Sequence, residues 1–244
     1  MTPRLFGVLA AVGVMALAAT AAAFTSNPPA RSGAASAGSD ADSAGEARQR
    51  APIPFELHPD IIVLSVKGFD SPDECKGPEV GVGDEELCLR ICKKGPDTVR
   101  VDLHGLQFLS RVIPGATPKQ DTVFLNNPQI EFPQPGRCGP GGVDTEEEEE
   151  ELKAKAAAGN LPESVGTQIV LKTMCLDVLL GVPGSGDTYD LGAKVTNPQL
   201  VEILSLIAGK TLSEEGADLV QDAIWQVTNY GGLKNEMRGR LRAL

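Results

Sequence analysis

The chain has 244 residues, of which 41% are hydrophobic and 23% charged, so it can bury one sizeable core or two small ones. Its formal net charge of −11, without any cluster of lysines and arginines, argues against nucleic-acid binding because phosphates would be repelled. These values describe a folded protein and exclude the basic, phosphate-binding classes.

The N-terminal segment is typical of an export signal. Arg4 supplies a positive charge, residues 5–19 are apolar, and Ala-Ala-Ala at 21–23 offers a cleavage site before Phe24. The apolar run is short for a bilayer span, which favours a cleaved signal peptide, residues 1–23, over a retained anchor. We therefore expect a soluble, exported protein in the periplasm, at the cell surface or outside the cell, with no membrane span after signal removal.

The following segment, residues 24–51, is rich in Ser, Ala, Gly and Pro and is predicted to be a disordered linker. A single β-rich domain is then expected over 52–232. Its first part, up to residue 143, should be mostly antiparallel β, because β-branched or alternating segments separated by turn residues predict strands over 61–66, 87–92, 98–103, 122–125 and 129–132.

The chain has five cysteines, an odd number, so at least one of them has no disulfide partner within the chain. Export to an oxidising compartment permits disulfides among the others. Cys75, Cys88, Cys92 and Cys138 precede the acidic segment and are expected to form two disulfides, with three connectivities open. Cys175 then remains without a disulfide partner. A free Cys88 or Cys92 is the alternative that the count leaves open.

An acidic insertion is predicted at about residues 140–160. Its six consecutive glutamates, 146–151, are typical of a solvated loop or a short exposed helix, and they lack the spaced Asp, Asn and Gly of a calcium loop. A strand over 167–176 and a Gly/Pro/Ser loop over 181–190 follow.

Two amphipathic helices are predicted near the C-terminus, over about 197–208 and 213–229. Asn197 is a good N-cap and Pro198 suits the first helical position. The basic residues 233–244 are expected to form a frayed tail. The expected fold is therefore α+β: an antiparallel β-sandwich or barrel with two C-terminal helices packed against it.

Two short motifs carry reactive chemistry. Cys175 lies between Met174 and Leu176 in the strand over 167–176, and Gln221 lies on the second helix, one turn before Trp225. A strand thiolate beside a helix carboxamide can attack the amide carbon, expel ammonia and leave an internal thioester. Met174, Leu176 and Trp225 would form an apolar surround that slows hydrolysis of this bond.

These motifs resemble those of bacterial surface thioester domains, which link a hydrophobic-Cys-hydrophobic motif to a hydrophobic-Gln-x-x-hydrophobic motif. The likeness covers about residues 167–232. It implies the thiol role for Cys175 and the acyl role for Gln221. It also implies adhesion by covalent attachment to an amine on a surface protein or another polymer.

Other interpretations stay open. Cys175 could be a structural thiol, since free cysteines are among the most buried residues. A cysteine hydrolase would need a histidine base beside Cys175, and no motif places His58 or His104, the two histidines of the chain, next to it. A zinc site would need Cys88, Cys92 and His104 as ligands, but outside the cell these cysteines are better used in disulfides. We predict a non-enzymatic binding or adhesion module with no cofactor or metal. The alternative is a disulfide-stapled extracellular structural or ligand-binding module without covalent chemistry.

Overall fold

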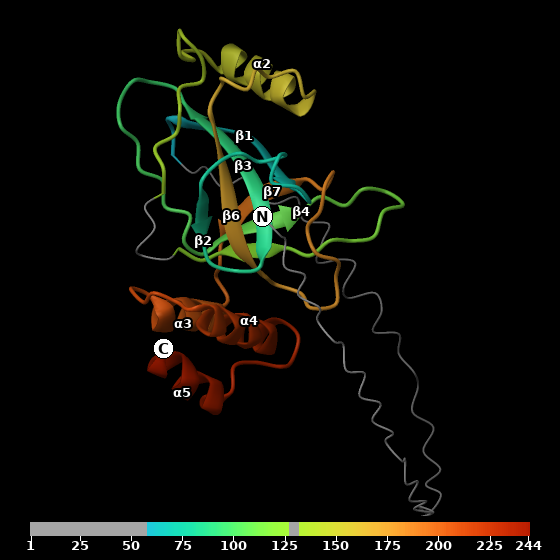
Figure 1. Ribbon diagram of the computed structural model, residues 1–244, viewed down its shortest axis with the longest axis vertical. Helices are drawn as coiled ribbons and strands as arrows, with labels where there is room; N and C mark the ends of the chain where they lie inside the picture. Colours follow the sequence, from blue (N-terminus) through green and yellow to red (C-terminus); the bar gives the residue numbers. More distant parts are fainter. Residues whose placement is uncertain (1–57, 127–131) are drawn as a thin grey trace, which may run out of the picture. The chain divides into compact units, whose positions relative to one another are not determined.

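The computed structural model describes residues 58–126 and 132–244. The predicted signal peptide (1–23), the predicted linker (24–51) and most of the predicted strand 129–132 lie outside these residues. The described part of the chain holds seven strands and four helices (Figure 1). None of these helices is long and apolar enough to cross a membrane.

Six strands form one antiparallel sheet in the order β1-β3-β6-β5-β4-β7, and the seventh, β2, pairs with β6 in parallel. A bridge between Lys67 and Thr188 brings the β1 edge against the start of β7, so the sheet closes almost completely into a barrel. The α+β prediction is confirmed, in its barrel form. The strands are β1 (Ile61–Gly68), β2 (Glu79–Gly81), β3 (Glu85–Lys93), β4 (Leu106–Ser110), β5 (Thr122–Phe124), β6 (Thr167–Cys175) and β7 (Tyr189–Lys194).

The segment 98–103 alternates apolar and polar residues but forms no strand, so that prediction is wrong. Val99, Val101 and Leu103 are nevertheless buried in the barrel core, as the alternation requires. The segment covers the core without joining a ladder. Burial alone therefore produced the pattern that suggested a strand.

Alternation along β6 divides its side chains between two cores. Ile169 and Leu171 pack inside the barrel with Phe108 and Phe124, whereas Met174 faces outward into a cluster built by the C-terminal helices. Cys175 shares the inner face with Ile169 and Leu171 by this period of two. β6 thus joins the barrel core to the helical layer.

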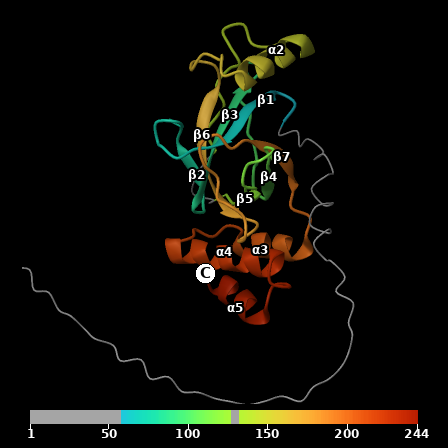
Figure 2. The same cartoon turned by 90° about the vertical axis from the view of Figure 1, so that its right-hand side faces the viewer.

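The helices lie at the two ends of the barrel (Figures 1 and 2). α2 (Glu146–Ala157) forms from the acidic insertion and packs near β1. α3 (Pro198–Ile207) and α4 (Glu214–Thr228) gather at the opposite end. The caps agree with the sequence: the Asn197 side chain accepts from the Gln199 N–H, and Ser213 accepts from the Gly216 N–H.

The expected frayed tail is instead a fourth helix, α5 (Asn235–Ala243), so that expectation is wrong. Its Met237 and Leu241 are buried against α3 and α4. Arg238 makes a two-pronged contact with Glu202 of α3, at 2.8 and 3.0 Å. Two apolar residues one turn apart are enough to dock a helix that is otherwise basic.

We predict that Leu241→Ala destabilises the fold by about 2–5 kcal/mol, because it removes a fully buried side chain from the helical cluster. Leu244→Ala is the matched control, since Leu244 is 40% exposed and should change stability little. Urea denaturation followed by circular dichroism measures both. Equal unfolding midpoints for the two variants would show that α5 does not contribute to the core.

Candidate functional site

The disulfides leave one thiol over, as predicted. Cys75 pairs with Cys88 and Cys92 with Cys138, and Cys175 is free and buried. Cys88 and Cys92 lie four residues apart on β3, so each reaches a different loop. A zinc site through these two cysteines is therefore excluded. The described residues contain no group of three or more His, Cys, Asp or Glu side chains placed to hold a metal ion.

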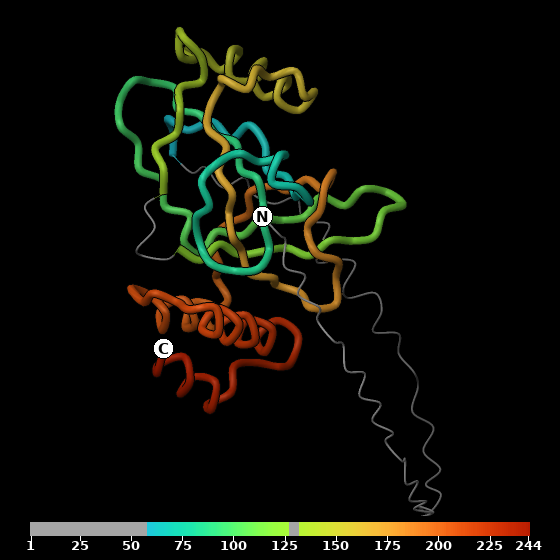
Figure 3. Tube along the Cα trace, in the orientation of Figure 1, coloured from blue at the N-terminus to red at the C-terminus, as the bar shows by residue number. Residues whose placement is uncertain are grey.

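Cys175 and Gln221 come together across 46 positions of sequence. Cys175 is the last residue of β6, which runs from the α2 end of the barrel to the C-terminal helices (Figure 3). The Cys175 N–H donates to Gln221 Oε1 at 2.8 Å, and Gln221 Nε2 donates to the Cys175 carbonyl at 2.9 Å. Gln221 is 8% exposed, so its carboxamide is held in a buried position by the residue that carries the thiol.

The sheet geometry explains this pairing. β3 begins at Glu85, opposite Thr173, so Cys175 extends beyond the end of β3. On the other side of β6, the Leu176 N–H donates to the Asp121 carbonyl. The main-chain groups of Cys175 therefore point to the side that β3 has left open. The Gln221 carboxamide takes the place of the missing strand and satisfies both of them.

Glu85 is the side chain next to the thiol. Cys175 Sγ donates to Glu85 Oε1 at 3.2 Å. Burial raises the pKa of Cys175, and the neighbouring Glu85 charge raises it further, so the thiol is protonated at neutral pH. Burial also raises the pKa of Glu85. No sequence motif marked Glu85, because its position depends on the register of β3 against β6.

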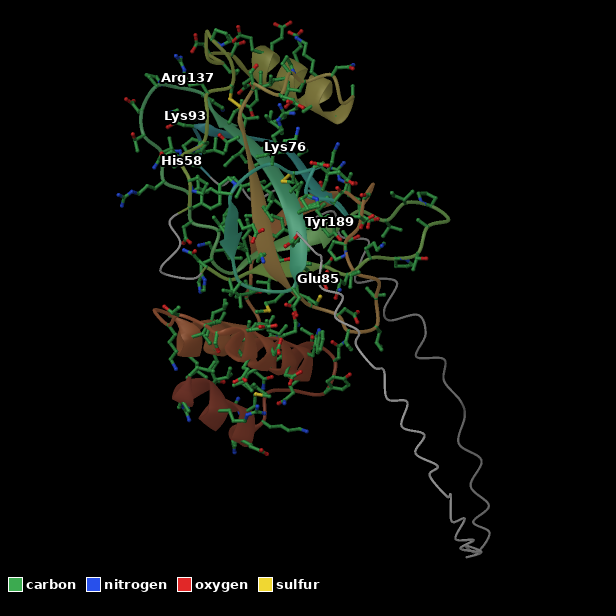
Figure 4. All side chains as sticks on the ribbon, viewed as in Figure 1. His58, Lys76, Glu85, Lys93, Arg137 and Tyr189 are labelled. Carbon is green, nitrogen blue, oxygen red and sulfur yellow. A yellow bond between two sulfur atoms is a disulfide. The ribbon has the colours of Figure 1, made fainter. Side chains whose placement is uncertain are left out.

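Three more polar side chains surround this pair inside the barrel: Gln120, Thr122 and Tyr189, which are 2%, 0% and 3% exposed. Thr122 stands directly opposite Cys175 in the β5–β6 pairing. Burial raises the pKa of Tyr189, and the nearby charges of Asp187 and Glu85 add to this effect. Figure 4 shows Tyr189 and Glu85 in the same region of the barrel.

The expected apolar surround holds on one side only. Met174 and Leu176 belong to the outer cluster packed by the helices, and Trp225 is half-buried on α4. Because neighbouring residues of a strand point to opposite faces, Met174 and Leu176 cover the helix side of the sheet. The sulfur itself faces polar groups such as Glu85. The expected apolar surround is therefore interrupted on the barrel side, where Glu85 contacts the sulfur.

The two histidines are engaged elsewhere. His104 Nδ1 accepts a hydrogen bond from the Asn126 N–H, and the Asp60 N–H donates to His58 Nδ1. Glu85 is the titratable group that contacts the thiol directly. A cysteine–histidine hydrolase arrangement is therefore not built here.

No protein-family model, curated protein or solved structure matches this chain.

Proposed function

We propose that this protein is a disulfide-stabilised exported module in which Cys175 and Gln221 form an internal thioester that captures an amine-bearing partner. The two disulfides fit an oxidising compartment outside the cytoplasm. The observation that carries the proposal is the pair of hydrogen bonds holding the Gln221 carboxamide to the main chain of Cys175. They fix the acyl group beside the nucleophile before any reaction.

The same contacts supply the groups that thioester formation needs. Sγ of Cys175 attacks Cδ of Gln221, and negative charge develops on Oε1. The Cys175 N–H already donates to Oε1 at 2.8 Å, so it stabilises that charge as an oxyanion-hole donor does. Glu85 accepts the thiol proton along the existing 3.2 Å contact.

Glu85 then returns this proton to Nε2 of Gln221, which leaves as ammonia. A carbon–sulfur bond replaces a carbon–nitrogen bond, and no oxidant, reductant or cofactor is consumed. When an amine attacks the thioester, Gln221 becomes an N-substituted amide and Cys175 regains its thiol. Each molecule reacts once, so the activity is covalent attachment rather than turnover.

The raised pKa of Cys175 suits such a role. A buried, protonated thiol resists oxidation and disulfide exchange in an oxidising compartment. It reacts only with the carboxamide held against it. The thioester would then store an electrophile in a protein whose other four cysteines are already paired.

We predict that intact mass spectrometry of the mature protein shows a deficit of one ammonia beyond the hydrogens lost to the two disulfides. Methylamine should remove the deficit, label Gln221 and release the Cys175 thiol in the same reaction. A protein of full mass whose Cys175 is alkylated only after unfolding would contradict the proposal. It would support the structural module without covalent chemistry.

Two matched variants control this experiment. Cys175→Ser keeps the main-chain contacts and a donor for Glu85 but removes the sulfur, and it should have full mass. Gln221→Glu keeps the size of the side chain but has no ammonia to lose. Gln221→Ala is a poorer control, because it leaves the buried N–H and C=O of Cys175 without hydrogen-bond partners. Each unpaired group should lower the stability of the fold by about 1–3 kcal/mol.

A further inference from the structure

Three buried oxygen atoms beside Cys175 have no hydrogen-bond partner among the described residues: Gln120 Oε1, Thr122 Oγ1 and Tyr189 Oη. Their side chains are 2%, 0% and 3% exposed. A buried polar group without a partner destabilises a fold, and native proteins leave few such groups unpaired. Gln120 Oε1 can only accept a hydrogen bond and the two hydroxyl oxygens can accept as well as donate, so a hydrogen-bond donor can satisfy all three together.

These three residues lie around the thiol in the barrel interior. Thr122 is the cross-strand partner of Cys175, and side chains in such a pair share a face of the sheet. Gln120 precedes Thr122 by two residues and lies against the Cys175 sulfur, where it favours the thiolate in opposition to burial. Tyr189 belongs to the inner barrel core, where burial and then the charges of Asp187 and Glu85 raise its pKa.

The chemistry of this cluster favours a cation that donates several hydrogen bonds. Glu85 adds a carboxylate to the three oxygens, and Asp84 and Asp187 add negative charge nearby. Lys119, whose charge acts on Glu85, already donates to the Val182 carbonyl at 2.8 Å and pairs with Asp187 at 3.2 Å. A primary ammonium group carries three N–H donors and one positive charge, which matches what the cluster offers.

We propose that Gln120, Thr122, Tyr189 and Glu85 form a subsite for a primary ammonium group, which in a protein partner is the end of a lysine side chain. This inference rests on the proposed thioester, because the ammonium bound there is the amine to be acylated. Glu85 is half-buried whereas the other three are buried, so an amine arriving from solvent meets Glu85 first. A lysine amine ends a long unbranched stem and can reach inward past Glu85, whereas the amine of a chain terminus stands next to a branched carbon.

The reaction at this subsite balances. The bound ammonium transfers one proton to the Glu85 carboxylate, and the free amine attacks the Gln221 thioester carbon. The carbon–sulfur bond breaks, and the second amine proton passes to the departing Cys175 sulfur. Glu85 releases its proton to solvent. A hydroxyl group brings no positive charge to the oxygens, so the subsite discriminates in favour of amines.

The binding test does not depend on the thioester. In Cys175→Ser, methylammonium chloride should raise the melting temperature in a saturable manner, whereas the same concentration of tetramethylammonium chloride, which has no N–H, should not. Adding Tyr189→Phe to this variant should abolish the methylammonium shift. Equal shifts with both salts, or a shift that survives Tyr189→Phe, would overturn the subsite.

A kinetic test uses the thioester-bearing protein. Thr122→Val and Tyr189→Phe should each lower the ratio of methylamine incorporation to hydrolysis by about tenfold, the effect of about 1.4 kcal/mol. An unchanged ratio in both variants would overturn the subsite and leave the thioester intact. A wild-type protein with no ammonia deficit would instead overturn the proposed function, and the melting-temperature test would still decide whether the cluster binds an ammonium ion.

Discussion

Replacing Glu85 by glutamine should slow thioester formation by about 10²–10⁴-fold, the usual contribution of a general base. Glutamine has the same shape and can still accept a hydrogen bond from the Cys175 thiol, but it cannot take the thiol proton. The Cys175 N–H and the Gln221 carboxamide stay in place, since neither bonds to Glu85. The rate is measured as the growth of the ammonia deficit after refolding from denaturant.

The neighbouring residue provides a matched control. Glu86 lies next to Glu85 on β3 but points to the other face, where it lies 3.7 Å from Lys172. Glu86→Gln removes the same charge from the same strand without touching the thiol. It should form the thioester at the rate of the unmodified protein. A Glu85→Gln protein that gains the deficit as fast as Glu86→Gln would show that Glu85 is not the base.

The stability of these variants separates catalysis from folding. Burial raises the pKa of Glu85 above 4.5, so the folded state favours its protonated form. This stabilisation is present below the ordinary pKa and is lost as the pH rises through the folded value. At neutral pH the unmodified protein therefore keeps a half-buried charge that Glu85→Gln lacks. Glu85→Gln should be at least as stable there, and a slow reaction could not be attributed to misfolding.

The sequence was sufficient to single out Cys175 and Gln221 but not to predict the geometry between them. Cys175 and Gln221 were each marked by a local motif with apolar neighbours. Their contact depends on β3 beginning at Glu85, which leaves the end of β6 open on one side. The start of a strand depends on pairing with distant residues, so no local pattern records it.

The surrounding polar residues were missed for the same reason. Glu85, Gln120, Thr122 and Tyr189 come from three strands and a loop, and only the barrel register brings them to one end of its interior. Tyr189 was even placed in the predicted loop 181–190, whereas it begins β7. β4 and β7 are short and carry glycine or polar residues, which weakened their alternation. Gly192 of β7, for example, approaches Leu109 and Gln107 of β4 too closely for a larger side chain to fit without a shift.

The helix α5 shows the opposite case, in which a local signal was present but small. Met237 and Leu241 stand four residues apart and form its whole apolar stripe. The segment also contains three arginines between residues 238 and 242, and this basic composition led to the prediction of a frayed tail. Arg238 in fact helps to dock the helix through Glu202. The basic residues therefore lie on the exposed face of the helix, and they did not predict whether the segment folds.

The largest loss of stability is expected on removing the Cys92–Cys138 disulfide. The chain-entropy estimate for its separation of 46 residues is about 4 kcal/mol, against about 3 kcal/mol for the 13 residues between Cys75 and Cys88. Cys92 and Cys138 are also buried among Ile62 and other core residues near α2, so the loss of packing adds to the loss of the cross-link. Urea denaturation of the two double-alanine variants measures the difference.

Both cysteines of a pair must be replaced together, because a single replacement leaves a thiol that can exchange with the remaining disulfide. Cys92→Ala/Cys138→Ala alters the α2 end of the barrel, whereas Cys175 and Gln221 lie at the end near α4. While it remains folded, this variant should therefore still show the ammonia deficit, at a lower denaturation midpoint. A larger loss of stability in Cys75→Ala/Cys88→Ala would contradict the loop-length argument. It would mean that the short disulfide holds β3 in the register on which Glu85, and with it the site, depends.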